Sequence, residues 1–392
     1  MTAALRVLYL VHDLSDPAVL RRIAMLRQGG AQVTVGGFRR TATAPEDVGG
    51  APAVDFGQTF NGNFLQRIAS VLGSVIKLGR HRTLFESADI IIARNLEMLA
   101  IGVRGRALSS TPAPLVYESL DIHRLLLRTD KLGAMLRALE GWLSRRACLL
   151  ITSSPAFIRE YFEKRSRLRL PVLLIENKVF TLKPPVPAGN RQPGPPWIIG
   201  WFGAIRCRKS LSVLRELVSR SEGTVKVVIR GRPSYDQMPD FDRLTGDTPG
   251  LSFVGPYKNP DDLPTMYRQV HFTWAIDMFE EGLNSSWLLP NRLYEGGLHG
   301  SVPLAQESVE TGHRMAQLGI GIRFPAINAE ALLEFFSHLT ITQYQNLEQD
   351  VARLSTATWM HGQQASEAFV ALLRRLPAQV APTSLPLPVE ML

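Results

Sequence analysis

The chain has 392 residues, 45% apolar and 20% charged, which is an ordinary globular composition for two or three domains. Its two cysteines, Cys148 and Cys207, cannot form a disulfide framework or a zinc site, so a reducing cytoplasm is the expected compartment. No run of about 18 apolar residues occurs, so we expect no membrane-spanning helix. The N-terminal run LRVLYLVHDL is too short for a signal peptide and predicts a buried strand.

The net charge of +9 is unevenly distributed along the chain. Residues 1–190 hold 26 Lys and Arg against 15 Asp and Glu, whereas residues 191–392 hold 18 against 20. Nucleic acid, an anionic membrane surface or a phosphate-bearing acceptor would each explain a basic first half, and so would a solvated basic surface. Basic and aromatic residues are not interleaved, which argues against nucleic acid.

Strand-like apolar runs alternate with helical patterns through the first half. The predicted strands are Val7–Val11, Gln32–Gly36, Ile90–Ala93, Leu115–Tyr117, Leu149–Thr152 and Leu173–Ile175. Helical patterns at Pro17–Arg27 and Lys131–Arg146 lie between them. Such alternation predicts βαβ units on a parallel sheet, here an N-terminal domain of residues 1–183.

A proline- and glycine-rich stretch, residues 184–196, predicts a linker, after which the alternation restarts. The later predicted strands are Trp197–Phe202, Val225–Arg230, Leu251–Val254 and His271–Ala275, and the later predicted helices are Ser210–Arg220, Asp261–Gln269, Ala329–His338 and Thr342–Leu376. We therefore expect an α/β fold of two Rossmann-like domains facing across a cleft, the second spanning residues 197–376. Its last helix could return to the first domain, and residues 377–392 are expected to be disordered.

Two loops of the second half carry cations at predicted strand ends. In GAIRCRKS, Gly203 allows close approach of a ligand, and Arg206, Arg208 and Lys209 gather at a helix start. Arg230 follows the next strand in the same way. Fixed cations at a helix N-terminus suit a diphosphate, although a cationic surface loop would have the same sequence.

The segment PNRLYEGGLHGSVPLA combines a proline-opened helix with one acid and a following strand. Pro290 fits a first helical turn, because its missing N–H would have no partner there. Arg292 and Glu295 follow on the helix. An acid beside a helix start can hold a sugar hydroxyl while the helix start faces a phosphate, so the segment predicts a nucleotide-sugar site.

In the first half, YESLDIHR places Asp121 and His123 after a predicted strand. Either side chain could act as a base on an acceptor hydroxyl or help to hold a donor sugar, and both could instead only fix the loop. Asp16 is expected to cap the helix that opens at Pro17. Further polar residues at strand ends are His12, Asp13, Arg94, Asn95 and Glu97.

Two other segments have open interpretations. The D-x-D at Asp240–Asp242 could hold a metal ion, but it lies in a polar stretch without a further ligand, and we expect a solvated loop and no metal site. Residues 64–82 form an amphipathic pattern with basic flanks. Such a helix could lie in a membrane interface or pack on its own domain, and the positive charge of this half favours the membrane.

The second half resembles the donor domain of GT-B glycosyltransferases, above all the family-4 enzymes of bacterial polysaccharide synthesis. Four elements match in order between Trp197 and Phe324: GWFGAIRCRKSL, VKVVIRGRP, FVGPYKNPDDLPTMYRQV and PNRLYEGGLHGSVPLA. The resemblance implies a GT-B fold, with Glu295 on the nucleotide ribose and His123 near the donor sugar. Lys209, with Arg206 or Arg208, would neutralise the diphosphate without a metal.

Some positions depart from the family pattern. Trp287 stands where many members have a second acid, and Asn284 or Glu281 is a possible substitute. Ala204 stands where an arginine often follows the phosphate-loop glycine. The first half resembles, more loosely, exopolysaccharide-assembly transferases that act on lipid-linked saccharides.

These observations predict a glycosyltransferase that uses a nucleotide-diphosphate sugar as co-substrate, without any other cofactor. It would extend a lipid-linked saccharide, with no nucleic-acid partner, as a peripheral protein at the cytoplasmic face of an anionic membrane. Two alternatives stay open: a nucleotide-sugar epimerase of the same fold, and a non-catalytic nucleotide-sugar-binding assembly protein.

Overall fold

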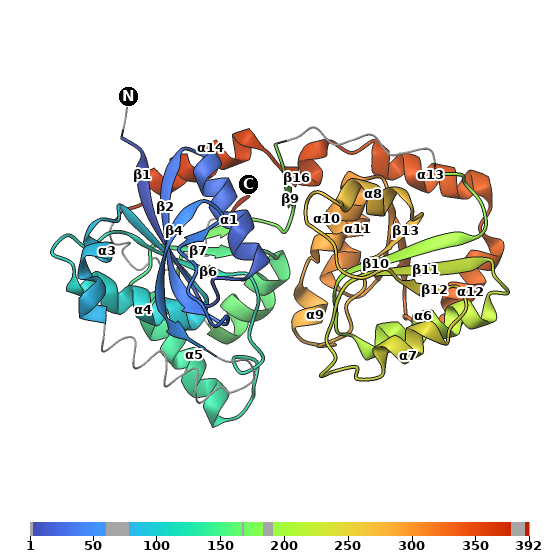
Figure 1. The fold of residues 1–392 in the computed structure, drawn as a ribbon, viewed down its shortest axis with the longest axis horizontal. Coiled ribbons are helices and arrows are strands. Elements are labelled where there is room, and N and C mark those ends of the chain that lie inside the picture. Colours follow the sequence, from blue (N-terminus) through green and yellow to red (C-terminus); the bar gives the residue numbers. More distant parts are fainter. Residues whose placement is uncertain (1–2, 60–77, 167, 183–190, 378–388, 392) are drawn as a thin grey trace. The chain divides into compact units, whose positions relative to one another are not determined.

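The computed structural model describes residues 3–59, 78–166, 168–182, 191–377 and 389–391. The chain forms two compact units (Figure 1): the first holds Met1–Glu176 and Gly362–Leu392, and the second holds Asn177–His361. The division therefore falls before the predicted linker. Arg191, inside that linker, has a buried side chain that donates to the carbonyl oxygens of Tyr267 and Gly300 in the second unit, at 3.1 and 2.9 Å.

The first unit is built on a nine-stranded sheet with the order β17-β8-β7-β6-β5-β1-β2-β4-β3. Its strands are β1 Leu5–Val11, β2 Ala31–Arg39, β3 Asp47–Val48, β4 Ala51–Gln58, β5 Ile90–Arg94, β6 Leu115–Ser119, β7 Leu149–Thr152, β8 Val172–Leu174 and β17 Val389–Met391. Apart from the β3–β4 hairpin, all pairs are parallel. The predicted disorder of residues 377–392 is wrong at β17, because its backbone pairs with β8.

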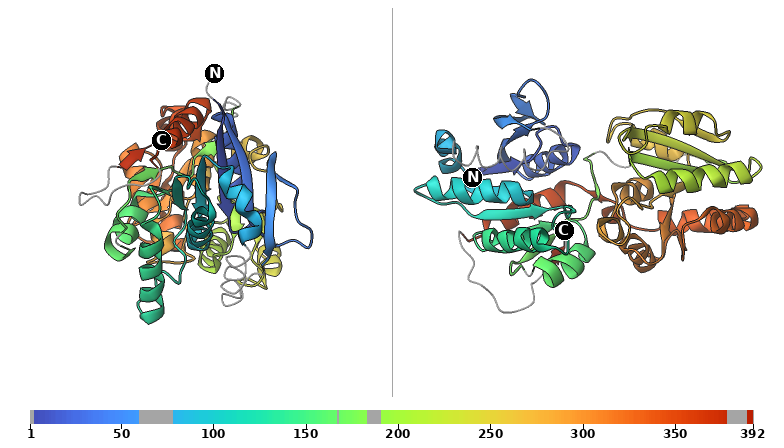
Figure 2. Two further views of the ribbon diagram at one scale, coloured as in Figure 1. Left: turned by 90° about the vertical axis from the view of Figure 1, so that its left-hand side faces the viewer. Right: turned by 90° about the horizontal axis from the view of Figure 1, so that it is seen from below.

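Helices cover both faces of this sheet (Figure 2). They are α1 Pro17–Gln28, α3 Arg82–Glu86, α4 Asn95–Leu108, α5 Lys131–Ser144, the π-helix Phe157–Ser166 and α14 Gln363–Arg374. The side chain of Asp16 accepts from Ala18 N at 2.9 Å, which confirms the predicted cap of α1. Helix α14 packs on α1 at Gly29, where any Cβ would lie 2.3 Å from the carbonyl oxygen of Ser366.

The second unit has a six-stranded parallel sheet with the order β12-β11-β10-β13-β14-β15. Its strands are β10 Trp197–Ile205, β11 Val225–Pro233, β12 Leu251–Phe253, β13 Phe272–Trp274, β14 Val302–Gln306 and β15 Ile322–Phe324, with β9 Val179–Phe180 and β16 Met360–His361 forming a separate pair. Trp197, Trp201 and Trp274 are among the largest fully buried side chains and fill its core.

The helices of this unit also lie on both faces of the sheet. They are α6 Arg208–Arg220, α7 Phe241–Gly246, α8 Leu263–Arg268, α9 Asn284–Trp287, α10 Asn291–Leu298, α11 Glu310–Leu318, α12 Ala329–His338 and α13 Ile341–Ala352. The predicted single helix Thr342–Leu376 is wrong: α13 ends at Ala352, a short 3-10 turn and β16 follow, and α14 begins at Gln363. The second unit ends at His361, and the chain re-enters the first unit at Gly362, which has extended backbone.

Candidate functional site

The strand order of the second unit fixes where a ligand can bind. In chain order the six strands follow the 3-2-1-4-5-6 Rossmann arrangement, so the order reverses between β10 and β13, which pair directly. A crevice forms at the carboxyl ends of the strands at such a reversal. The segments that leave β10 and β13 there contain Arg206 and Asp277, respectively.

Two glycines lie side by side where β10 and β11 end. Gly203 pairs with Gly231 in the sheet, and both have positive φ, +116° and +141°. A Cβ on Gly231 would lie 1.8 Å from the carbonyl oxygen of Gly203, so glycine is required. A Cβ on Gly203 would meet only the hydroxyl of Tyr257, at 4.0 Å. The backbone of β10 is therefore open to close approach at this point.

A shared carboxylate connects the segment after β10 to α10. Asp277 lies 3.9 Å from Arg206 and 3.8 Å from Arg292. Arg292 also donates to the carbonyl oxygen of Ile276 at 2.7 Å, and the guanidinium of Arg206 lies 4.7 Å from the ring centre of Phe279. Burial alone would raise the pKa of Asp277, but Arg292 and hydrogen bonds outweigh it and hold the pKa below its usual value.

The other predicted cations have separate partners. Lys209 Nζ lies 2.7 Å from both carboxylate oxygens of Glu281, and the two side chains are 52% and 46% exposed. Arg208 donates to Asp240 at 2.5 Å, and Arg230 donates to a carbonyl oxygen of the loop after β12 at 3.3 Å. Arg206, Lys209 and Arg292 thus all contact residues 276–281, while Arg208 is directed to the D-x-D segment.

Glu295 is buried on α10 and oriented from two sides. The amide of Asn259 donates to its Oε1 at 2.7 Å, and the hydroxyl of Tyr267 donates to its Oε2 at 3.1 Å. The nearby Tyr257 has its pKa raised by burial and by the charge of Glu295. The hydroxyl of Tyr257 thus lies beside Gly203, and the charge of Glu295 acts on it.

Sequence reasoning missed three residues of this arrangement: Tyr257, Asn259 and Asp277. Tyr257 and Asn259 lie within the run FVGPYKNPDDLPTMYRQV, which carries part of the family resemblance. That run was the signal that could have identified these two residues. Asp277 follows β13 directly, and position at a strand end could have identified it.

The structure places both the possible substitute for the second family acid, Asn284 in α9, and the D-x-D at Asp240–Asp242. Asn284 begins α9 and is 5% exposed, and Trp287, at the position of the second family acid, is also buried. Asp240 is paired with Arg208, and Asp242 accepts from the hydroxyl of Tyr235 at 3.0 Å. Among the residues that the structure describes, no group of three or more His, Cys, Asp or Glu side chains is placed to hold a metal ion.

The first unit has its own strand reversal, between β1 and β5. His12 follows β1 and Asn95 follows β5, and the Asn95 Nδ2 lies 3.2 Å from His12 Nδ1. Asn95 has a positive φ of 69°, and burial lowers the pKa of His12. The predicted Asp121 and His123 lie after β6 with exposed side chains, and His123 Nδ1 accepts from Leu125 N at 3.3 Å.

A buried polar cluster supports this edge. Arg94 donates to the hydroxyl of Tyr9 at 3.3 Å and lies 3.2 Å from Asp16, the cap of α1. Tyr9 in turn donates to Glu118 at 2.5 Å, and Glu118 also accepts from Arg22 at 2.7 Å. The ends of β1, β5 and β6 are therefore held by charge-assisted hydrogen bonds in a site that excludes water.

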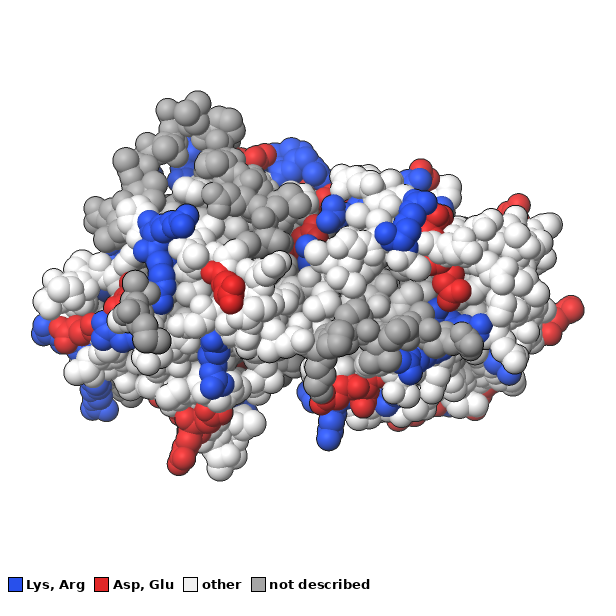
Figure 3. Space-filling view, turned by 90° about the horizontal axis from the view of Figure 1, so that it is seen from above, with Lys and Arg blue, Asp and Glu red and all other residues white. Residues whose placement is uncertain are grey.

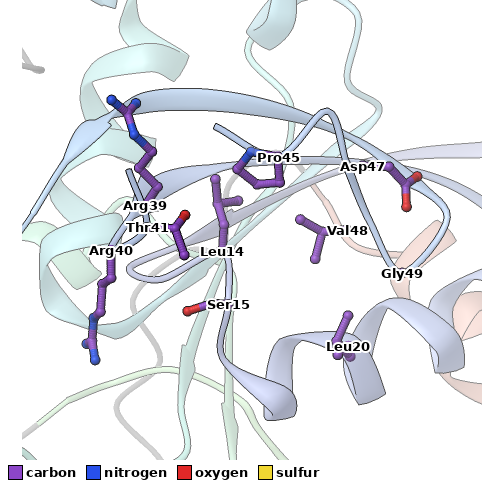
Figure 4. A pocket seen from close by; sticks show the side chains of 10 residues that line it. All are labelled: Leu14, Ser15, Leu20, Arg39, Arg40, Thr41, Pro45, Asp47, Val48 and Gly49. Atoms are coloured by element: carbon purple, nitrogen blue, oxygen red, sulfur yellow. The ribbon is translucent and has the colours of Figure 1, made fainter. Parts of the chain in front are cut away.

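A hollow of about 260 Å³ lies beside the carboxyl ends of β1 and β2 (Figure 4). In this view the side chains of Leu14, Pro45 and Val48 face the hollow, while the guanidinium groups of Arg39 and Arg40 point away from it. Arg40 lies 2.9 Å from the buried Asp13, and Arg39 pairs with Asp55. Because Ser15, Thr41 and Asp47 also line the hollow, its surface is mixed, with polar groups beside the apolar ones.

Two expectations concern the surface of the molecule. The basic segment 64–82 lies largely outside the described residues, which resume at Leu78, so its predicted membrane helix stays a prediction. Within the described ranges, no helix has the length and apolar character needed to cross a bilayer. On the face drawn in Figure 3, Lys and Arg side chains are interspersed with Asp and Glu.

Comparisons with known proteins identify the family. No family model matches the chain. It is 45% identical over 388 residues to the succinoglycan biosynthesis protein ExoL of Rhizobium meliloti, covering 97% of this chain and 96% of ExoL.

Solved structures show the fold. Sucrose-phosphate synthase of Thermosynechococcus elongatus superposes with a TM-score of 0.69 at 11% identity, covering 95% of this chain and 98% of that one. Anabaena HepE in complex with UDP superposes with a TM-score of 0.64 at 14% identity, covering 94% and 99%. The predicted GT-B fold and exopolysaccharide resemblance are confirmed: the chain belongs to the family of the succinoglycan biosynthesis protein ExoL.

Proposed function

We propose that this protein is a glycosyltransferase of exopolysaccharide biosynthesis, which moves a sugar from a nucleotide-diphosphate donor to a saccharide acceptor. Its relative ExoL is named for succinoglycan biosynthesis, and the GT-B neighbour HepE was crystallised with UDP. The observation that carries the proposal is the grouping of Arg206, Lys209 and Arg292 around residues 276–281 at the strand reversal. Arg292 lies on α10, the same helix as Glu295.

In this proposal the donor lies at the carboxyl ends of β10, β11 and β13. The open backbone at Gly203 admits the diphosphate, and Lys209, Arg206 and Arg292 stabilise the negative charge that grows on it as the bond to the sugar breaks. Glu295 accepts hydrogen bonds from the ribose hydroxyls and exchanges its contact with Asn259 for them. Arg208, Arg230 and Asn284 border the donor in the same proposal.

We place the acceptor at the carboxyl edge of the first sheet. His12 and Asn95 lie there at the strand reversal, with the buried cluster of Arg94 and Glu118 beneath them. Asp121 and His123 follow the next strand and are the proposed catalytic residues: one of them removes the proton from the acceptor hydroxyl. A lipid-linked saccharide, presented at the cytoplasmic face of an anionic membrane, is the proposed acceptor.

The donor can be identified by a thermal-shift screen of uridine-, guanosine- and thymidine-diphosphate sugars. We expect one nucleotide to raise the melting temperature of the wild type and to have a much smaller effect on Glu295→Gln. Glu307→Gln is the matched control, because Glu307 is an exposed acid of the same unit. Equal stabilisation of the wild type and Glu295→Gln, with both folded before addition, would refute the site.

The two alternatives make different predictions for the same protein. An epimerase would interconvert the sugar nucleotide without any acceptor, and a binding protein would hold it unchanged. Both share the donor site, so product analysis, not binding, separates them from the transferase.

A further inference from the structure

Helix α5 exposes apolar side chains where a surface helix normally exposes polar ones. Met135, Leu139 and Trp142 are 59%, 43% and 51% exposed. Their spacing of four and three residues places them on one face of the helix. Figure 1 shows α5 at the lower margin of the first unit, outside the sheet.

The opposite face of α5 is also largely apolar and holds the only acid of the helix inside. Leu136 and Leu143 are buried, and Glu140 is fully buried. The hydroxyl groups of Tyr117 and Tyr161 donate to the Glu140 carboxylate at 2.7 and 2.6 Å. A helix that is apolar on both faces is expected to be covered on both. The residues that the structure describes cover only one of them.

Cations border the exposed stripe at both ends of the helix. Lys131 begins α5, and the exposed Arg145 and Arg146 follow its last residue. The guanidinium of Arg146 lies 5.0 Å from the ring centre of Trp142. Because Glu140 is buried, the exposed face of α5 from Lys131 to Ser144 has no acid.

We propose that this face of α5 docks on a membrane that contains anionic phospholipids. The helix would lie in the interface, with its apolar stripe among the acyl chains and its terminal cations at the phosphates, and Trp142 is suited to the boundary. Its length of roughly 21 Å would be parallel to the surface. The inference deepens the membrane partner of the proposed function and assigns it to a helix outside segment 64–82.

Charge complementarity decides between a membrane and another occupant. A second copy of this chain would bring the same Lys131, Arg145 and Arg146 against themselves or against an acid. The exposed face of α5 has no acid, and the exposed N-cap Asp130 is already paired with Arg128. Anionic headgroups pair with cations at both ends of the helix at once. A dimer through this face is therefore an outcome that the test must detect.

The test is co-sedimentation of the full chain with vesicles, without donor or acceptor. We expect wild type to bind phosphatidylglycerol vesicles better than phosphatidylcholine vesicles, and less at high salt. The triple variant Met135→Gln/Leu139→Gln/Trp142→Gln should bind roughly tenfold more weakly or worse, because it removes the apolar area that enters the bilayer. The control Val254→Gln/Ile341→Gln removes exposed apolar groups of the second unit and should bind as wild type does.

A second variant, Lys131→Glu/Arg146→Glu, should lose the preference for phosphatidylglycerol. Wild-type vesicle binding by the triple variant would overturn the proposal, as would no binding by wild type. A wild-type dimer that the triple variant converts to a monomer with unchanged vesicle binding would assign the face to a second copy instead. Stabilisation of each variant by nucleotide shows that it is folded, and it tests the donor site separately.

Discussion

The ion pair of Lys209 and Glu281 gives a prediction in which the two partners have opposite effects. In the proposed site Lys209 must exchange Glu281 for a phosphate oxygen when the donor binds. Lys209→Met should therefore weaken binding of the nucleoside diphosphate, whereas Glu281→Gln removes a competing carboxylate and should strengthen it.

The magnitudes follow from exposure and charge. With side chains 52% and 46% exposed, the pair contributes about 0–1 kcal/mol to folding, so both variants should unfold close to wild type. A hydrogen bond from Lys209 to a phosphate contributes about 1.5–3 kcal/mol, which corresponds to a rise in Kd of roughly tenfold to a hundredfold. Release of Lys209 by Glu281→Gln should lower Kd by no more than about fivefold.

Isothermal titration calorimetry with the nucleoside diphosphate selected by the screen measures both effects, and urea unfolding checks the stability. Unchanged affinity in Lys209→Met would mean that this is a surface ion pair without a role in binding. Weaker binding in Glu281→Gln would contradict the competition and would place Glu281 in contact with the donor.

Three further predictions test the backbone, the pH dependence and the first unit. Gly231→Ala should lower the free energy of unfolding by roughly 2–4 kcal/mol, because the added Cβ would clash with β10. Gly223 also has positive φ but lies in open space, so Gly223→Ala should lower it less; urea unfolding measures both. Burial lowers the pKa of His299 from 6.5 to about 4, so the unfolded chain binds the additional proton between these values and stability should rise with pH across that window. His299 contributes at most about 3 kcal/mol to this change in stability. The slope of the free energy of unfolding against pH should therefore be smaller in His299→Phe, and equal slopes in the two proteins would contradict the prediction. Asp121→Asn and His123→Ala, at exposed positions, should leave melting unchanged and reduce sugar transfer, and full activity in both would remove them from the mechanism.

Local sequence patterns predicted the elements that depend on local signals. The alternation of apolar runs and helical patterns located β10 and β11, whose register then places Gly203 beside Gly231. The polar start after β10 predicted α6, which begins two residues before the expected Ser210. These elements are identifiable because a parallel strand that is buried on both faces has a nearly continuous apolar run. In β10 and β11, a glycine near the end of the run also permits positive φ.

Features that depend on tertiary contacts could not be predicted in the same way. The contact of Asn259 with Glu295 spans 36 residues, and no periodicity connects them. Likewise, the apolar pattern of α5 is typical of a buried helix, and only the structure shows that Met135 and Trp142 are exposed while Glu140 is inside. The unit boundary at Glu176 was missed because proline and glycine content identifies turns, not the point at which contacts change partners.

Product analysis with a labelled sugar nucleotide tests the central claim most directly. The purified protein is incubated with the donor identified by the screen and with membranes that carry lipid-linked saccharides. We predict that the label moves into the lipid-extractable saccharide with wild type, and that Lys209→Met and Glu295→Gln greatly reduce this transfer. Label that stays on the nucleotide, either as the original sugar or as its epimer, would contradict a glycosyltransferase.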